Sequence, residues 1–129
     1  MARNGMKRDE SHGRAGVMST ALAGMGVLHF SRPRAFDGLI PRALPGSART
    51  WTYGSGVAEL AVAGLLAVPA TRRVGGKAAQ VLFLAVWPGN FYHAWRARKA
   101  SPMIRAVTLA RLPLQIPMIR AAGRLARGR

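Results

Sequence analysis

The chain has 129 residues, half of them hydrophobic, with a formal net charge of +16 and no cysteine. This length fits a single domain, and the lack of cysteine excludes disulfides, thiol chemistry and cysteine-ligated zinc or iron–sulfur centres within the chain. The basic residues cluster at the flanks of apolar runs instead of covering one face. That pattern is typical of a membrane protein and argues against a nucleic-acid partner.

The N-terminal part of the chain combines a polar segment with a short apolar run. Residues 1–14 are polar and predict a disordered, basic N-terminal segment. The run 15–30 is short for a span, but snorkelling of the flanking Arg side chains allows it to cross a bilayer. Gly16, Thr20 and Gly24 form a small-residue stripe that favours close helix packing. A cleaved signal peptide is the weaker interpretation, because cleavage would fall in the middle of the run.

The most apolar run, residues 51–69, contains one acid, Glu59. At about 1.5 Å rise per residue this run covers the ~30 Å of a bilayer core. A carboxylate there costs about 2.5 to 3.5 kcal/mol on insertion scales, so Glu59 must be paired or protonated. The preceding residues 31–50 contain three prolines, which exclude a long helix and predict a loop or short helix at the membrane surface.

Two more apolar runs follow a basic turn at residues 70–77. The run 78–95 ends in aromatic residues, as at a membrane interface, and its Pro88 frees a carbonyl near Leu84. The run 102–119 predicts a fourth span, although its two Arg and two internal Pro residues leave a helix lying in the interface as a rival. Residues 120–129 predict a basic C-terminal tail. Basic residues are more numerous on the side of the termini, which predicts that both termini are cytoplasmic.

The polar residues inside the spans predict one buried cluster. Glu59 lies ~12 Å and Arg111 ~13.5 Å below the same surface, which predicts an ion pair between them. Polar stripes on three helices are expected to meet in the bundle interior, since lipid-facing stripes are unfavourable. The candidate cluster consists of His29, Ser55, Glu59, Asn90, Arg111 and Gln115.

This cluster has more than one interpretation. Buried polar groups fix helix register, or they line a cavity for a quinone ring or lipid head group with Glu59 exchanging a proton. Haem ligation by His29 and His93 is a third hypothesis, though two such histidines are more often interfacial hydrogen-bonding groups. The sequence contains no paired nucleophile and base, phosphate-binding loop or metal constellation, so no catalytic residue and no metal site is predicted.

Several motifs together resemble the DoxX-like family of small integral membrane proteins. They occur in the family's order, and the match covers roughly residues 15–119. The motifs are His29-Phe30, Phe36-Asp37, IPRALPG (40–46), WTYGSGVAEL (51–60), TRRVGG (71–76), Pro88-Gly89-Asn90 and ARLPLQ (110–115). The resemblance implies a four-helix membrane bundle and a loose link to redox enzymes, because the family takes its name from a small subunit of a thiosulfate:quinone oxidoreductase. The family more often has Phe and Ala where this chain has Trp87 and Gly89.

The sequence therefore predicts an all-α, four-transmembrane-helix bundle over residues 15–119, with spans at about 15–30, 51–69, 78–95 and 102–119. We expect a multi-pass protein of the cell membrane that acts as an accessory or scaffold subunit without catalysis or a cofactor of its own. Its partners would be the lipid bilayer and a membrane-associated oxidoreductase or another membrane subunit. The alternatives are a quinone-linked redox subunit that uses the polar cluster, and a small transporter or lipid-handling protein.

Overall fold

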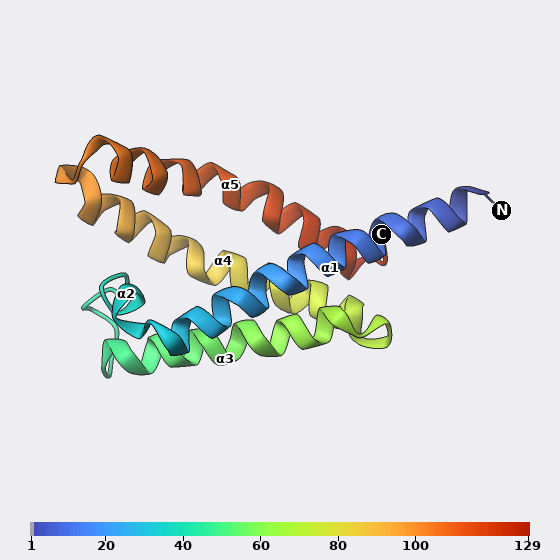
Figure 1. Ribbon diagram of the computed structural model, residues 1–129, viewed down its shortest axis with the longest axis horizontal. Coiled ribbons are helices and arrows are strands. Elements are labelled where there is room, and N and C mark those ends of the chain that lie inside the picture. Colours follow the sequence, from blue (N-terminus) through green and yellow to red (C-terminus); the bar gives the residue numbers. More distant parts are fainter. Residues whose placement is uncertain (1) are drawn as a thin grey trace.

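The computed structural model describes residues 2–129, and within this range every regular element is helical (Figure 1). The elements are α1 (Ala2–Ser31), α2 (Pro33–Asp37), α3 (Ala48–Ala67), the 3₁₀ turn η1 (Pro69–Thr71), α4 (Arg72–Arg96), the 3₁₀ turn η2 (Ala97–Lys99) and α5 (Pro102–Ala126). The predicted all-α class is confirmed.

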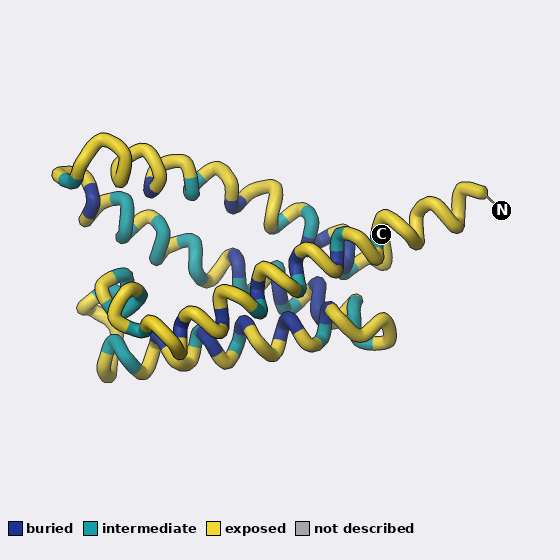
Figure 2. Tube along the Cα trace, in the orientation of Figure 1, coloured by how far each residue is buried: buried dark blue, intermediate teal, exposed yellow. Residues whose placement is uncertain are grey.

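The four long helices form two pairs. α1 packs along α3, α5 packs along α4, and the contact between α3 and α4 joins the pairs. In Figure 1 the pairs cross near η1 and diverge toward α2, and the N- and C-termini lie toward the same end of the molecule. The buried residues concentrate where the pairs cross (Figure 2). This shared core consists of Ala15, Met18, Leu22, Val62, Ala63, Leu66, Ala79, Phe83, Ala122 and Leu125. The two pairs therefore share their core near the η1 end, and their backbones diverge toward α2.

Local sequence signals explain where the helices begin and end. The Ser47 hydroxyl caps α3 by accepting a hydrogen bond of 3.2 Å from the Thr50 amide, which satisfies one of the free donors of the first turn. α2 and α5 each begin with a proline, at Pro33 and Pro102, where the missing amide hydrogen is not needed. α3 ends before Pro69, which cannot continue the helix.

The structure differs from the sequence at both termini. Residues 2–14, predicted to be disordered, form the exposed first turns of α1; this segment contains no proline, so the helix of the first apolar run continues into it. The predicted basic tail is helical up to Ala126, because Ala122 and Leu125 share one face and are buried against the core. α4 and α5 cover the predicted runs 78–95 and 102–119, and α3 covers the run 51–69 except for its last two residues, Val68 and Pro69.

The small residues that bring α1 and α3 together are not the ones that the sequence predicts. Gly16, Thr20 and Gly24 are exposed, and the two glycines have nothing within 4 Å of a Cβ position. The contact runs instead through Gly26 and Gly56: a Cβ at Gly26 would lie 2.8 Å from Leu60 Cγ, and one at Gly56 would lie 2.8 Å from Phe30 Cε2. The predicted stripe of Gly16, Thr20 and Gly24 thus lies on the wrong face of α1 for this contact.

Judged by length and composition, no single helix within residues 2–129 qualifies as a membrane span. α3 and the helical stretch Pro69–Lys99 qualify only together, as a pair bent by 109° where they join.

Candidate functional site

His29 and Glu59 form a buried pair between α1 and α3. His29 is 7% exposed and Glu59 is 8% exposed. The distance between His29 Nδ1 and Glu59 Oε2 is 3.0 Å. Gly56 makes this contact possible, since it lies one turn before Glu59 and a Cβ there would be 3.0 Å from His29 Cβ. A larger residue at position 56 would push the imidazole away from the carboxylate.

The imidazole of His29 makes two further contacts. Nδ1 donates its hydrogen to the Met25 carbonyl oxygen at 2.8 Å, so its close approach to the carboxylate is not a second hydrogen bond. The ring stacks on Phe36 of α2 with a centroid distance of 3.8 Å. Glu59 Oε2 is left without a hydrogen bond of good geometry in the described chain. It retains the capacity to hold a proton or to accept a hydrogen bond.

Asp37 fixes α2, and with it Phe36, against the start of α3. Its Oδ1 accepts a hydrogen bond of 2.7 Å from the Thr52 hydroxyl, and its Oδ2 accepts one of 3.0 Å from Arg49 Nε. Arg49 Nη2 also lies 3.0 Å from Oδ2. The predicted cluster did not include Asp37. A signal was present in the sequence, since Asp37 and Glu59 are the only acids beyond residue 10.

The Asp37 contacts lead to a pH prediction. The hydrogen bond from Thr52 and then the interactions with Arg49 hold the pKa of the Asp37 carboxyl below its usual value, which is about 3.9 in an unfolded chain. A lowered folded-state pKa contributes stability above the unfolded value, and this stability is lost as the pH falls through the folded one. We expect the unfolding temperature of Asp37→Asn to fall less between pH 6 and pH 3 than that of the parent, whereas Asp9→Asn should follow the parent.

The α4 and α5 helices are joined by reciprocal bonds from side chains to backbone. Gln115 Nε2 donates to the Phe83 carbonyl at 2.9 Å, and Trp87 Nε1 donates to the Leu112 carbonyl at 3.1 Å. Asn90 Nδ2 reaches Gln115 Oε1 at 3.4 Å. The acceptor at residue 83 lies beside the carbonyl that Pro88 leaves without its helical partner. Gln115 therefore bonds the neighbouring carbonyl and not that of Leu84, and a polar group for the Leu84 carbonyl stays a prediction.

Removing one of these bonds should measurably weaken the bundle. We expect Trp87→Phe to lower the free energy of unfolding by about 1 kcal/mol, because the Leu112 carbonyl loses its cross-helix donor. Trp95→Phe is the matched control, since this indole is 64% exposed, and it should change stability by less than ~0.5 kcal/mol. Equal losses in both variants, measured by thermal unfolding in mild detergent, would contradict the role of the Trp87 bond.

The predicted cluster divides into two sites. His29, Glu59 and the half-buried Ser55 belong to the α1–α3 pair, while Asn90 and Gln115 belong to the α4–α5 pair. The predicted ion pair between Glu59 and Arg111 is wrong: the ion pairs of residues 2–129 join Glu59 to His29 and Asp37 to Arg49. α1 covers the face of α3 that carries Glu59, whereas α5, which carries Arg111, packs mainly on α4.

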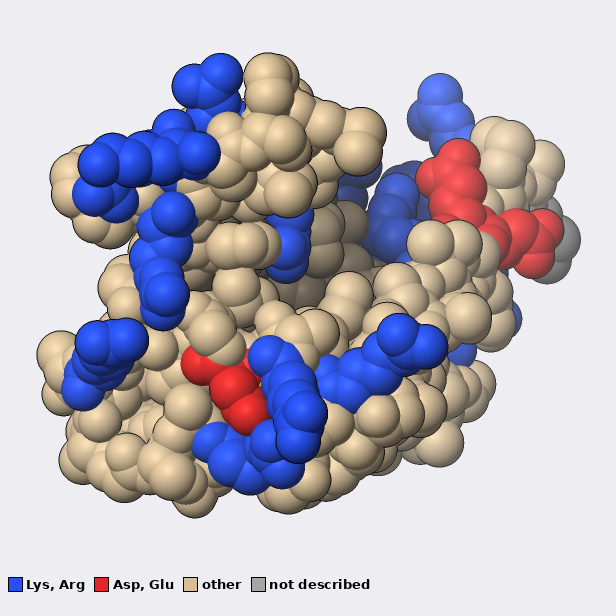
Figure 3. Space-filling model, turned by 60° about the vertical axis from the view of Figure 1, so that its left-hand side comes forward, with Lys and Arg blue, Asp and Glu red and all other residues tan. Residues whose placement is uncertain are grey.

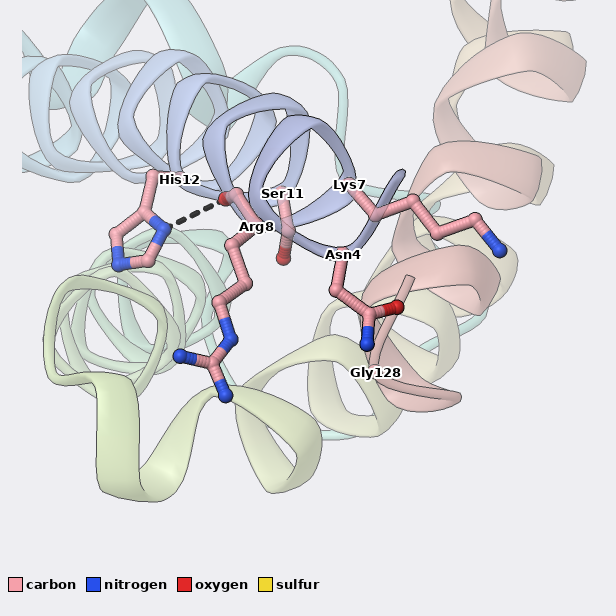
Figure 4. A pocket seen from close by; sticks show the side chains of 6 residues that line it. All are labelled: Asn4, Lys7, Arg8, Ser11, His12 and Gly128. Carbon is pink, nitrogen blue, oxygen red and sulfur yellow. Dashed lines mark hydrogen bonds between the residues drawn. The ribbon is translucent and has the colours of Figure 1, made fainter. Parts of the chain in front are cut away.

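Two open depressions lie outside these sites. One, of about 330 Å³, is formed by polar residues of the first turns of α1 and by Gly128 (Figure 4). In it His12 Nδ1 donates to the Arg8 carbonyl at 2.6 Å. The other, which we call the α2 groove, measures about 430 Å³ and lies at the α2 end of the bundle. Its lining is Asp37, Gly38, Ile40, Pro41, Arg42, Leu44, Gly46, Ala48, Trp51 and Arg96. Within residues 2–129 no group of three or more His, Asp or Glu side chains is placed to hold a metal ion.

Comparison with known proteins gives one match. No curated protein and no solved structure matches the chain. The model of one protein family matches residues 18–126, which include the second half of α1, all of α3, α4 and α5, both polar sites and the α2 groove. The chain therefore belongs to the family described as Domain of unknown function (DUF8561).

Proposed function

We propose that the protein is a multi-pass protein of the cell membrane and acts there as a non-catalytic accessory or scaffold subunit of a membrane complex. The observation that carries the membrane location is the distribution of charge along the helices. Residues 15–31 and 78–95 contain no Asp, Glu, Lys or Arg, and residues 50–71 contain only Glu59. On α5 the stretch 106–119 contains only Arg111. Charges are thus concentrated at the two ends of the bundle.

The outer surface of the bundle supports the same location. Large apolar side chains are exposed along α1, α3, α4 and α5, among them Val17, Val57, Val81, Val107 and Leu114, each at least 55% exposed. Exposed apolar side chains on all four long helices are expected where the surroundings are lipid, whereas larger exposed apolar patches are rare on monomeric soluble proteins. α3, with 20 residues, is about 30 Å long, which is the thickness of a bilayer core, although by length and composition it qualifies as a span only as a bent pair with the stretch Pro69–Lys99.

The accessory role rests on how the buried polar groups are used. Three polar side chains donate hydrogen bonds to backbone carbonyls of a neighbouring helix: Gln115, Trp87 and Ser19. Ser19 donates to the Ala63 carbonyl at 2.8 Å. Such bonds hold helices together in lipid. The resemblance to DoxX-like proteins supports the same proposal and suggests a membrane-associated oxidoreductase as the partner. The basic residues at the end that carries both termini favour a cytoplasmic location for that end.

A fractionation experiment tests the membrane location. Membranes from cells that express the full chain are washed first with high salt and then with alkaline carbonate. We expect the protein to remain in the pellet, because its attachment is apolar. Release by either wash would show a peripheral basic protein held by charge and would overturn the proposal.

The accessory role is tested on the membranes that retain the protein. The protein is extracted gently, and its companions are identified by mass spectrometry. A stoichiometric protein partner is the expected result, and a protein recovered alone would contradict the role.

The second candidate function is a quinone-linked redox subunit, and the geometry of Glu59 favours it. Its Oε2 is buried beside His29 and lacks a hydrogen-bond partner in the described chain, so a quinol hydroxyl could donate to it. Solvent extraction of the purified protein and absorbance spectroscopy would detect a bound quinone. Quinone present in the parent and lost in a folded Glu59→Gln variant would favour this candidate over the accessory role.

A further inference from the structure

The α2 groove joins a basic rim to an apolar floor. Arg42 and Arg96 supply the rim, and Ile40, Leu44 and Trp51 contribute the apolar part. The Trp51 indole is held in place, because its Nε1 donates to the Pro45 carbonyl at 2.7 Å. The groove is built from the segment between α2 and α3, from the start of α3 and from the last residue of α4.

The positive charge of the rim is not neutralised from within the protein. Asp37 is the acid of the groove, and it is already bonded to Arg49 and Thr52. In the part of the chain that the structure describes, neither Arg42 nor Arg96 has a carboxylate within 4 Å. Arg96 Nη1 donates to the Gly38 carbonyl at 3.3 Å, which holds this guanidinium at the edge of the groove. Figure 3 shows basic side chains gathered over this end of the molecule around a small acidic area.

The groove also lies at the correct level for an amphiphile. Arg49 and Arg96 end the charge-poor stretches of α3 and α4 on this side, so the rim sits where a bilayer's polar layer would begin. Trp51 and Trp95, at 40% and 64% exposure, lie at the same level, as aromatic residues do at membrane interfaces. A volume of about 430 Å³ falls within the range of small-ligand sites.

We propose that the α2 groove binds an anionic phospholipid. The phosphate lies between Arg42 and Arg96, and the first acyl carbons rest on Leu44 and Trp51. Guanidinium groups suit this ligand because they bind phosphate oxygens through directed, charge-assisted hydrogen bonds. The inference rests on the proposed membrane location, and it adds a specific lipid site to it.

The test measures lipid binding to the full chain. The protein is delipidated in a neutral detergent and titrated with phosphatidylglycerol, and bound lipid is counted by native mass spectrometry. We expect phosphatidylglycerol to bind at one site and phosphatidylcholine to bind much more weakly. Arg42→Gln and Arg96→Gln should each weaken binding about fivefold, and the double variant should weaken it more than tenfold. Arg→Lys at both positions should retain most of the affinity.

The matched control removes the same charge from the opposite end. Arg120→Gln with Arg124→Gln changes two exposed Arg residues of α5, and it should leave phosphatidylglycerol binding unchanged. If this control and the double variant of the groove lose phosphatidylglycerol binding equally, the lipid is attracted by charge without a specific site, and the proposal is overturned. Equal binding of phosphatidylcholine, or displacement of the lipid by millimolar inorganic phosphate, would overturn it as well. If specific lipid binding is not found but the protein remains in carbonate-washed membranes, only the lipid site is refuted. If the carbonate wash releases the protein, both the lipid site and the membrane location are refuted.

Discussion

Replacing Gly76 by leucine is expected to lower the free energy of unfolding by about 3 kcal/mol or more. Gly76 is buried at the point where α4 crosses the last turns of α5. A Cβ there would lie 2.8 Å from the Leu125 carbonyl carbon, 2.9 Å from the Ala122 oxygen and closer still to the Ala126 amide nitrogen. These are backbone atoms, so no side-chain rotation can make room. Thermal unfolding in mild detergent measures the loss.

Gly64→Leu provides the control for Gly76. Gly64 lies in α3 with nothing within 4 Å of its Cβ position, so leucine there should be neutral or should stabilise by up to ~1 kcal/mol through helix propensity. Gly76→Ala should already destabilise the fold, because the first carbon of the side chain meets the α5 backbone. If Gly76→Leu unfolds at the same temperature as Gly64→Leu, α5 does not pack on α4 in the way described.

The second large effect is expected at the pair of His29 and Glu59. We expect His29→Leu to lower the free energy of unfolding by about 3 kcal/mol, since it leaves a buried carboxylate without a basic partner. Replacing both residues by leucine should restore stability to within about 1 kcal/mol of the parent, because a well-packed apolar pair replaces a buried ion pair at little loss. The measurement is a double-mutant cycle by thermal unfolding, in which the two single changes are expected to be strongly non-additive.

The variant Arg111→Leu distinguishes the two partners considered for Glu59, His29 in the structure and Arg111 in the sequence-based prediction. If Arg111 were the partner of Glu59, its removal would be as harmful as the loss of His29. Among residues 2–129 Arg111 makes no ion pair, so we expect Arg111→Leu to change the free energy of unfolding by less than ~1 kcal/mol. A loss equal to that of His29→Leu would contradict the structure and favour the predicted Glu59–Arg111 pair.

The two polar sites also show why the predicted cluster was too inclusive. Periodicity along a helix places Thr52, Ser55, Gly56 and Glu59 on one face; Ser55 is half-buried, and the other three are buried. On α5, Thr108 and Gln115 are likewise buried on one face. Periodicity cannot show which helix a polar face meets. It defines the face within one helix and contains no information about the neighbouring helix. The prediction joined the stripes of three helices, whereas the fold pairs α1 with α3 and α4 with α5.

The sequence by itself determined the helical class, the approximate bounds of the central helices and the single acid in the most apolar run, and it left a loop or a short helix open for the proline-rich segment. These features depend on local chemistry: side-chain period, proline geometry and the energetic penalty of a buried charge. Only the tertiary structure decided that His29 is the partner of Glu59, that Asp37 holds Phe36 over the imidazole, and that Gly76 is the site of closest approach. The reason is that these contacts join helices whose order and rotation are set by packing over the whole bundle, and small residues far apart in the chain control how closely the backbones approach.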